Sequence, residues 1–358
     1  MVRPAIEEMM RKERIGAAAH LALASLSFVY GAGVRLRYGL YQAGVLRRKR
    51  LDCPVISIGN ITVGGTGKTP MTIFLASYLK KRGMRPVILS RGYKKTGPGG
   101  IVSDGRTLGL GPAEAGDEPY LMARRLPDVP VIVGADRFGA GLLAVERFRP
   151  DCAILDDGFQ HMRLERDIDI LLMDPARGLG NGYLLPRGIL REPAGAMRRA
   201  NLVMVKGGEL RGPEARLAER WQIPAVRFDY RASGLYGVLD GVEMGVDFLR
   251  GRKAAAFAGI ADPESFFKTL QGLGATLTKT FSFPDHHEYT GADIATIMKA
   301  KDAGADIYVT TEKDGVKLKG LLMKDAPRVF ALGVEVEVKD EAALNGLLAP
   351  IIKRVKGA

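Results

Sequence analysis

One glycine-rich turn, placed between an apolar run and a helix-like run, limits what this chain can fold into. The apolar run is PVISIG (54–59), and the turn follows shortly after it as Val63-Gly64-Gly65-Thr66-Gly67-Lys68-Thr69. Glycines allow backbone N–H groups to point inward around a phosphate, and the start of the next helix adds the positive end of its dipole. A lysine there reaches the terminal phosphates, and a threonine hydroxyl can bind Mg²⁺. The arrangement predicts an α/β protein with a phosphate-binding loop.

The spacing of this turn departs from the strict phosphate-loop pattern at one position. The pattern G-x-x-x-x-G-K-[ST] requires glycine at position 62, where this chain has Thr62. The alternative to phosphate binding is a chance glycine turn, which does not account for the lysine and threonine that follow. We predict that the phosphates of a nucleotide are held by Gly64, Gly65, Thr66, Gly67, Lys68 and Thr69.

Short apolar runs rich in valine and isoleucine recur after residue 50, with helix-like segments between them. Runs this apolar are typical of strands covered on both faces, as in a parallel sheet with crossover helices. The helix-like run Thr69–Arg82 ends at Gly83, a common C-terminal signal. Residues 178–200 are rich in glycine without clear periodicity, which predicts a long functional loop. The predicted strands are residues 54–59, 85–90, 129–134, 151–157, 168–174 and 201–206.

A second αβ pattern begins after a polar, β-like stretch at 227–239. Asp262 followed by Pro263 predicts the start of a helix, and a further helix is expected near 291–303. Strands are expected at 253–260, 276–283 and 305–311, and the run 329–338 is expected to pair with residues near 225–238. The predicted organisation is a helical segment at 1–50, a core at 51–224, an inter-domain strand at 225–239, a smaller α/β domain at 240–328, and a return strand with a C-terminal helix at 329–358.

The positive charge of the chain is concentrated at its N-terminus. The formal net charge is +13, and residues 1–50 hold ten lysines and arginines against three glutamates. Between these basic groups, residues 15–34 carry no formal charge and are rich in alanine, glycine and serine. We predict a helix that lies in an anionic membrane interface; the alternative is a surface helix that covers the core. No recognition-helix or zinc-finger pattern supports a nucleic-acid partner.

Polar clusters follow three of the predicted strands. They are Ser90-Arg91-Gly92-Tyr93, Gly134-Ala135-Asp136-Arg137 and Asp156-Asp157-Gly158-Phe159-Gln160-His161. The carboxyl ends of parallel strands meet at one edge of an open sheet, where such sheets bind ligands. A carboxylate at that edge can hold Mg²⁺ directly or through water.

Taken together and in this order, the motifs resemble the tetraacyldisaccharide 4′-kinase family, the lipid A 4′-kinases of lipopolysaccharide synthesis. The matching segments, between about residues 54 and 314, are ISIGNITVGGTGKTP, LSRGY, GDEP, GADR, LDDGFQH, RGILREP, FAGI, FPDHH and TTEKD. The resemblance implies transfer of the γ-phosphoryl group of ATP to the 4′-hydroxyl of a tetraacylated glucosamine disaccharide 1-phosphate. It implies a phosphate-loop kinase-like α/β domain with a mostly parallel sheet, a second, smaller α/β domain, and an N-terminal membrane-associated helix.

The resemblance also implies roles for individual residues. It implies that Lys68 and Thr69 serve ATP and Mg²⁺, and that Asp117 is the catalytic base, paired with His286. His287 remains an alternative to His286 because both follow Asp285 in the same motif. The carboxylates implied near the metal are Asp156, Asp157 and Glu192.

Several further side chains are candidates for substrate contact. A planar guanidinium suits phosphate oxygens, although each arginine could instead form a surface ion pair. Gln160 can hydrogen-bond substrate and Tyr93 can offer a face to a sugar, with core packing as the alternative for both. The segment Thr311–Asp314 either contacts nucleotide or is an ordinary helix start. The candidate substrate residues are Arg91, Tyr93, Arg137, Gln160 and Arg191.

A partitioning ATPase with a deviant phosphate loop is the main alternative function. That type usually carries a lysine just before the glycines, where this chain has Val63, and it does not explain the motif around His286. A membrane or nucleic-acid adaptor explains the basic N-terminus but not the carboxylates. The expected partners are therefore an acylated glucosamine disaccharide 1-phosphate and an anionic membrane surface, with no nucleic acid and no obligate protein partner. The expected location is the cytoplasmic face of the inner membrane.

Overall fold

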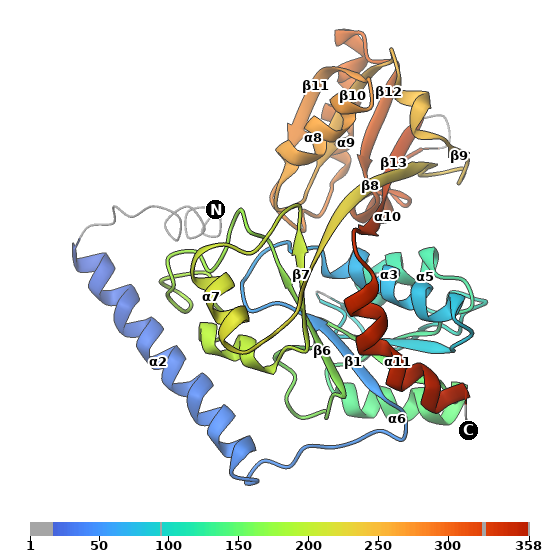
Figure 1. Cartoon of the computed structure of the whole chain (residues 1–358). Coiled ribbons are helices and arrows are strands. Elements are labelled where there is room, and N and C mark those ends of the chain that lie inside the picture. The colour runs from blue at the N-terminus through green and yellow to red at the C-terminus, as the bar shows by residue number, and fades with distance from the viewer. Residues whose placement is uncertain (1–16, 94, 324–326, 357–358) are drawn as a thin grey trace.

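The computed structural model describes residues 17–93, 95–323 and 327–356 (Figure 1). The first seven strands, β1–β7, are neighbours in the sheet and form a first group. All of them are parallel except β3, which runs antiparallel to β4. The six strands predicted for this region are present within two residues at each end. Their bounds are β1 Val55–Gly59, β2 Pro86–Ser90, β3 Gly100–Ser103, β4 Val131–Val133, β5 Cys152–Asp156, β6 Ile168–Met173 and β7 Leu202–Lys206.

Strand β3 was not predicted. It is only four residues long, and it directly follows a Gly-Pro-Gly sequence that favours a turn. A short strand at the edge of a sheet, half-buried at its first two residues, carries little of the periodic signal on which sequence analysis depends.

Helices cover both faces of the first group of strands, as the apolar strand sequences require. In β5, Cys152 and Ile154 face one hydrophobic cluster, whereas Ala153 and Leu155 face another. One face is covered by α3 (Lys68–Lys81), α5 (Asp117–Arg125) and α11 (Ala342–Lys356). The other is covered by α6 (Arg137–Phe148), the 3-10 helix η1 (Ala194–Arg199) and α7 (Gly212–Arg220). The short α4 (Pro112–Ala115) precedes α5, and η1 lies within the segment expected to be a loop.

The second group of strands is also parallel and is covered on both faces. It comprises β10 (Lys253–Ala258), β11 (Thr276–Ser282) and β12 (Ile307–Thr311). The side chain of Asp262 accepts a hydrogen bond from the Ser265 amide at the start of α8 (Pro263–Gly272), as predicted. The remaining elements are the 3-10 helix η2 (Val246–Leu249), α9 (Gly291–Met298), the 3-10 helix η3 (Lys299–Ala303) and α10 (Glu312–Leu318).

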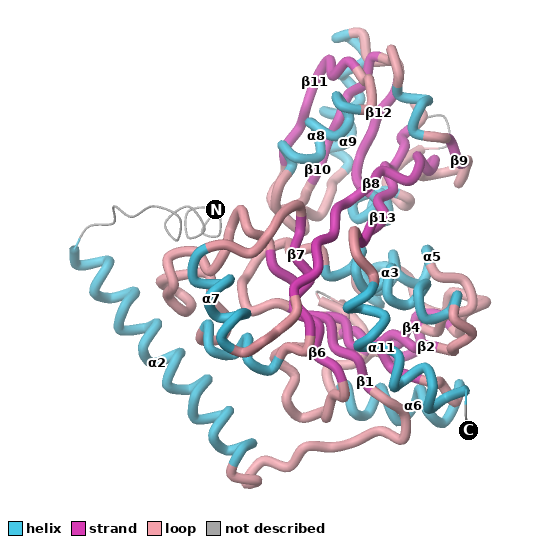
Figure 2. The backbone as a smooth tube through the Cα atoms, viewed as in Figure 1, coloured by secondary structure: helices cyan, strands magenta, loops and turns pink. Residues whose placement is uncertain are grey.

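Two long strands join the groups into one continuous sheet. Strand β8 (Ala225–Gly237) pairs with β7 at its start and antiparallel with β13 (Val329–Val338), which in turn pairs with β12. The pairing expected between 329–338 and 225–238 is therefore confirmed. The strand order is β11-β10-β12-β13-β8-β7-β6-β1-β5-β2-β4-β3, with β9 (Glu243–Met244) beside β8. Figure 2 shows β8 rising from the first group into the second.

A long N-terminal helix, α2 (Ala17–Gln42), lies along one side of the first group (Figure 1). Five large apolar side chains on it are mostly exposed: Leu21, Leu26, Phe28, Val29 and Leu36. Within residues 17–93, 95–323 and 327–356, no helix combines the length and apolar character needed to cross a membrane. The basic residues predicted to flank the helix at positions 3–14 lie outside the described residues.

An ion pair joins the two groups where α5 meets α10. The Arg125 guanidinium lies 2.7 Å from the Glu312 carboxylate, and the two side chains are only 15% and 13% exposed. Burial raises the pKa of Glu312, and the charge of Arg125 opposes that rise. Glu312 also accepts a hydrogen bond from the Val334 amide of β13.

We expect Glu312→Gln to lower the free energy of unfolding by roughly 2 kcal/mol, because it leaves a poorly hydrated arginine with only the half-exposed Glu335, 3.7 Å away, as a counter-charge. The matched control is Asp247→Asn, which removes a carboxylate from a pair with Arg250 whose side chains are 85% and 80% exposed. That change should cost less than about 0.5 kcal/mol. Urea unfolding measures both, and equal losses would contradict a role for the Arg125–Glu312 pair.

Candidate active site

The glycine-rich turn leads from β1 directly into α3. Gly64 and Gly67 have positive φ angles of 108° and 79°, a backbone region that favours glycine. The side chain of Asn60 donates a hydrogen bond to the Thr66 hydroxyl over 2.8 Å, which braces the turn from within. The first turn of α3 holds no acidic side chain, so its N-terminal dipole is not neutralised there. The turn therefore has the backbone of an anion-binding loop.

The missing glycine at position 62 has a structural explanation. Thr62 lies in an isolated antiparallel bridge with Leu190, from the long segment that follows β6. The residue is thus held in an extended arrangement that does not require glycine. The departure from the strict motif reflects this extra pairing and leaves the turn from Gly64 onward intact.

Asp157 lies beside the phosphate loop between two cations. Its carboxylate is 2.9 Å from Arg191 Nη1 through either oxygen and 3.8 Å from Lys68 Nζ. Burial by itself raises the pKa of Asp157, but Lys68 and Arg191 outweigh it and hold the pKa below its ordinary value. Asp157 is therefore an anion at neutral pH that fixes the direction of both cations.

The neighbouring carboxylate of Asp156 has the opposite electrostatic character. It accepts hydrogen bonds from the hydroxyls of Ser90 (3.0 Å) and Thr72 (3.3 Å). Burial raises its pKa to about 7, and the nearby charges of Glu118 and Asp157 add to the rise. Paired carboxylates with opposed pKa shifts are typical of functional sites. The described part of the chain places one ionised and one readily protonated carboxyl group side by side.

Asp117 and His286 are both brought to the contact between α5 and α10. Asp117 begins α5, and its carboxylate lies 3.4 Å from Lys317 Nζ. His286 Nε2 lies 3.0 Å from Lys313 Nζ and 3.9 Å from Glu118 Oε1. Burial lowers the pKa of His286, and Lys313 lowers it further, which favours the neutral ring. These contacts place both residues in one network, while their direct pairing stays a prediction.

His287 has different neighbours. Its Nε2 lies 3.1 Å from the Asp293 carboxylate, which also caps the start of α9, and its ring stacks on Phe283. His286, in contrast, has a left-handed backbone with a φ of 59°, and Asp157 has one of 50°. Such conformations are costly for residues with a side chain and concentrate at functional sites. Of the two histidines, His286 contacts Lys313 and lies near Glu118, whereas His287 contacts α9.

The predicted substrate arginines differ in their surroundings. Arg137 is 4% exposed, and its buried Nε has no hydrogen-bond partner among the described residues. Burial lowers its pKa to about 10, against the opposing effect of Asp156. Arg91 is exposed and close enough to Arg137 to repel its charge. Arg191 is already held by Asp157, so these three arginines are not equivalent.

Two other predicted contacts lie close to the same edge of the sheet. The Gln160 side chain donates to the Asn60 carbonyl over 2.8 Å, which ties it to the turn that enters the phosphate loop. The Tyr93 ring is 46% exposed and lies 5.1 Å from the His286 ring. Tyr93 is therefore a partly exposed aromatic side chain beside the network of α5 and α10.

The residues present fit a magnesium ion held mainly by phosphates. Mg²⁺ commonly keeps several waters and takes one or two carboxylates together with the substrate phosphates. The hydroxyl of Thr69 and the carboxylates of Asp156 and Asp157 are the groups predicted to supply that set. Glu192, predicted to join them, lies 2.7 Å from Arg199 and neutralises it. Within the described ranges, no three His, Cys, Asp or Glu side chains form a cluster that could hold a metal.

Sequence analysis missed residues that close over the phosphate loop from other segments. The Arg177 guanidinium lies against Gly64, and the hydroxyl of Tyr230, on β8, lies against Gly67. That hydroxyl is buried without a partner in the described part of the chain. Lys313 and Lys317 follow Thr311 with helical spacing, so the sequence indicates that they share a helix face. Nothing in the sequence indicates which residues they contact.

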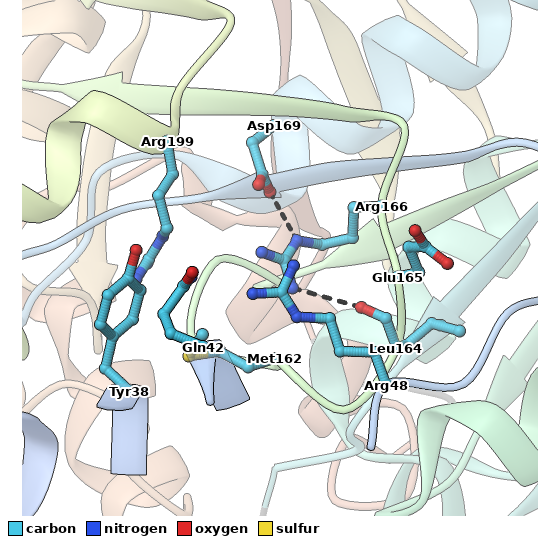
Figure 3. Close-up of a pocket in the computed structure, with 9 residues that line it drawn as sticks. All are labelled: Tyr38, Gln42, Arg48, Met162, Leu164, Glu165, Arg166, Asp169 and Arg199. Carbon is cyan, nitrogen blue, oxygen red and sulfur yellow. Dashed lines mark hydrogen bonds and ion pairs between the residues drawn. The ribbon is translucent and has the colours of Figure 1, made fainter. Parts of the chain in front are cut away.

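A separate cavity of about 210 Å³ lies near the start of β6, at the other end of the strands from the phosphate loop (Figure 3). It is bounded by the end of α2 and by Asp169 near the start of β6, whereas the phosphate loop follows the end of β1. Arg166 spans it and pairs with Asp169 at 2.8 Å. The cavity is not part of the candidate active site.

We expect the stability of Asp156→Asn relative to the natural protein to rise with pH, in the absence of ATP and Mg²⁺. A pKa raised in the folded state gives stability that is lost as pH rises, here between about 4 and about 7. The Asp156→Asn variant does not show this loss. Its free energy of unfolding relative to that of the natural protein therefore rises by a few kcal/mol across that interval. Asp151→Asn is the matched control, because Arg85 lowers the pKa of Asp151 and a lowered pKa acts only at more acidic pH. Urea unfolding at a series of pH values measures the differences, and parallel curves for both variants would refute the assignment.

Comparisons with known proteins agree over nearly the whole chain. A family model described as tetraacyldisaccharide-1-P 4′-kinase matches residues 19–353. A tetraacyldisaccharide 4′-kinase of Syntrophus aciditrophicus is 44% identical, covering 96% of this chain and 95% of the relative. One of Geobacter metallireducens is 46% identical, covering 92% and 97%.

The fold agrees as well. A crystal structure of the "apo" form of LpxK from Aquifex aeolicus in complex with ATP superposes with a TM-score of 0.76. It is 37% identical to this chain, and the match covers 93% of this chain and 99% of that one. Family model, relatives and fold coincide, and the chain belongs to the tetraacyldisaccharide 4′-kinase family.

Proposed function

We propose that the protein transfers the γ-phosphoryl group of ATP to the 4′-hydroxyl of a tetraacylated glucosamine disaccharide 1-phosphate, a step of lipid A biosynthesis. The observation that carries this proposal is the meeting of α10 with α5 beside the phosphate loop. A phosphate loop alone would also suit the partitioning ATPase considered above. The cluster of Asp117, Glu118, His286, Lys313 and Lys317 adds acid–base groups that ATP hydrolysis by such a loop does not require.

The chain's own residues divide the work of the transfer. Backbone N–H groups of Gly64–Gly67 and the Lys68 ammonium hold the ATP phosphates. Asp117 accepts the proton of the attacking hydroxyl, since phosphoryl transfer needs a group that orients the nucleophile. Lys317, 3.4 Å away, holds that carboxylate in position. His286 stays neutral beside Lys313 and orients the part of the site that receives the attacking hydroxyl.

Mg²⁺ would be held by Thr69 together with Asp156 and Asp157, and when bound it neutralises charge on the transferred phosphoryl group. Glu192 would be a further candidate near the metal; it is paired with Arg199 at 2.7 Å, just as Asp157 is paired with Arg191 at 2.9 Å. The buried guanidinium of Arg137 has an Nε without a partner in the described ranges, which suits a phosphate oxygen of ATP or of the substrate. Arg91 lies beside it, and the partly exposed ring of Tyr93 suits a sugar ring.

We also propose that α2 rests on an anionic membrane surface, at the cytoplasmic face of the inner membrane. Its exposed apolar side chains include Phe28 (73% exposed) and Leu36 (65% exposed). Arg35, Arg37, and the basic run 47–50 lie on or just after the same helix. Apolar residues with flanking positive charge are typical of helices that lie in a membrane interface. This placement would bring the site to an acylated substrate.

The activity is tested with labelled ATP, Mg²⁺ and the acylated disaccharide 1-phosphate in mixed micelles. We expect a labelled lipid product, and we expect chelation of Mg²⁺ to abolish it. Labelled inorganic phosphate without labelled lipid would favour the ATPase alternative instead.

In this assay Asp117→Ala should lower kcat by a factor of about 10² to 10⁴, because it removes the group that accepts the proton. Affinity for ATP should change little, since Asp117 lies in α5 and the phosphate loop is formed by other residues. Glu146→Ala, an exposed carboxylate on α6, is the matched control and should keep full activity. Loss of ATP binding by Asp117→Ala would instead indicate a structural role.

Membrane contact is tested by sedimentation with vesicles that contain phosphatidylglycerol. Replacing Phe28 and Leu36 together by serine should lower partitioning at least about tenfold, because apolar area no longer leaves water. Leu142→Ser is the matched control: this leucine is 49% exposed but lies on α6. If the two proteins lost partitioning equally, the face of α2 would not be the contact.

A further inference from the structure

We propose that α2 is a positioning element of the active site, acting through Ser27, Tyr30 and Gly31 on the segment 184–191. This segment in turn holds Asp157 and the entry to the phosphate loop. The inference rests on the proposed kinase activity for its kinetic test, but it concerns a different part of the molecule. It assigns to α2 a second task besides contact with a membrane.

Three neighbouring residues of α2 hold the segment. The Ser27 hydroxyl donates to the Leu184 carbonyl and the Tyr30 hydroxyl donates to the Arg191 carbonyl, each over 2.8 Å. Gly31 packs so tightly here that a Cβ on it would lie 2.7 Å from Leu184 Cδ1. Ser27 is only 6% exposed, although much of α2 is open to solvent. The face of α2 that carries these residues is a fitted contact.

The same segment pairs with the residues that lead into the phosphate loop. The Arg191 amide donates to the Ile61 carbonyl, and the Val63 amide donates to the Ile189 carbonyl, each over 2.8 Å. Val63 immediately precedes Gly64. The Arg191 side chain then reaches Asp157, which faces Lys68. A continuous series of hydrogen bonds therefore leads from the Tyr30 hydroxyl to the catalytic charges.

A second contact joins α2 to the other end of this region. The Tyr38 hydroxyl accepts a hydrogen bond from Arg198, 3.1 Å away. Arg199 lies 5.9 Å from the Tyr38 ring, beside it in Figure 3, and its other contacts include Glu192 at 2.7 Å. Glu192 is the residue next to Arg191. Two points of α2 thus contact this region: Tyr30 bonds the Arg191 backbone, and Tyr38 meets the side chains of Arg198 and Arg199.

The segment is closed by turns but has no helix or strand of its own: the Leu185 amide donates to the Leu190 carbonyl, and the Gly188 amide donates to the Leu184 carbonyl. Between the end of β6 and η1, the described residues form no helix and no strand, only isolated bridges to Leu190. Turns outside any helix or sheet open at a lower free-energy cost than regular elements do, unless other elements hold them. Loss of a hydrogen bond from α2 should therefore change the position of Arg191 before it changes the fold.

Three matched pairs of substitutions on the same helix test the proposal. Each pair deletes or adds the same atoms with and without a contact to the segment. Ser25 bonds only within its own helix, to Leu21 O, in the described contacts, and a Cβ on Gly33 meets nothing within 4 Å. The pairs, contact residue first, are Tyr30→Phe with Tyr41→Phe, Ser27→Ala with Ser25→Ala, and Gly31→Ala with Gly33→Ala.

We expect each contact variant to lower kcat by about five- to tenfold, the usual effect of one lost hydrogen bond or a small clash, and each control to stay within about twofold. Affinity for a fluorescent ATP analogue should fall in parallel, which gives a readout that does not need turnover. Vesicle partitioning of Tyr30→Phe should equal that of the natural protein. Equal kcat and ATP affinity in contact and control variants would overturn the proposal, as would a loss of kcat that follows lost partitioning.

A double-mutant cycle separates positioning from general destabilisation. If Tyr30 acts through Arg191, then Tyr30→Phe should cost at most about twofold in an Arg191→Lys background, where the contact with Asp157 is already disturbed. Fully multiplicative losses would overturn the route through Arg191. If the natural protein makes no labelled lipid, the proposed function fails, whereas the ATP-affinity comparison still decides this inference.

Discussion

The antiparallel pairing of β8 with β13 is the constraint on which the rest of the structure depends. Each strand is hydrogen-bonded to one group of parallel strands at one end and to the other long strand along its length. Because one sheet runs through both groups, α10 is held against α5, and Arg125 pairs with Glu312 at the contact. The acid–base cluster of Asp117 and His286 exists only because residues 169 positions apart are brought together in this way.

Charge in the site is arranged so that neighbouring groups have different protonation states. Burial raises the pKa of Asp156 to about 7, so that both of its protonation states are populated at neutral pH, whereas Lys68 and Arg191 keep its neighbour Asp157 ionised. Binding of a cation would reverse the balance at Asp156, since a nearby positive charge favours its ionised form. The proton affinity of this one buried group is therefore coupled to occupation of the site.

Much of the fold follows from patterns that are local in the sequence. Apolar runs bounded by glycine and proline locate β1, β2 and β5–β7, and Asp262 with Pro263 locates the start of α8, because these signals arise within a few residues. The phosphate loop is equally local. Partners across the sheet are not: nothing near Lys317 indicates Asp117, and nothing near Glu192 indicates Arg199, since such pairs depend on the packing of distant elements. Motif resemblance identified several of these residues without indicating their contacts.

Thr62 connects the one irregular position of the phosphate-loop motif to the N-terminal helix. A glycine there would free the backbone, but this chain pairs the position with Leu190 and so ties the loop to the segment 184–191. That segment contains no strand or helix, and Ser27 and Tyr30 of α2 donate hydrogen bonds to its backbone. A motif that departs from the strict pattern at one residue has thus exchanged local freedom for a tertiary restraint. The phosphate loop, Asp157 and α2 therefore form one connected unit. The exposed face of the helix can contact a surface, while its buried face keeps the charged side chains of the site in position.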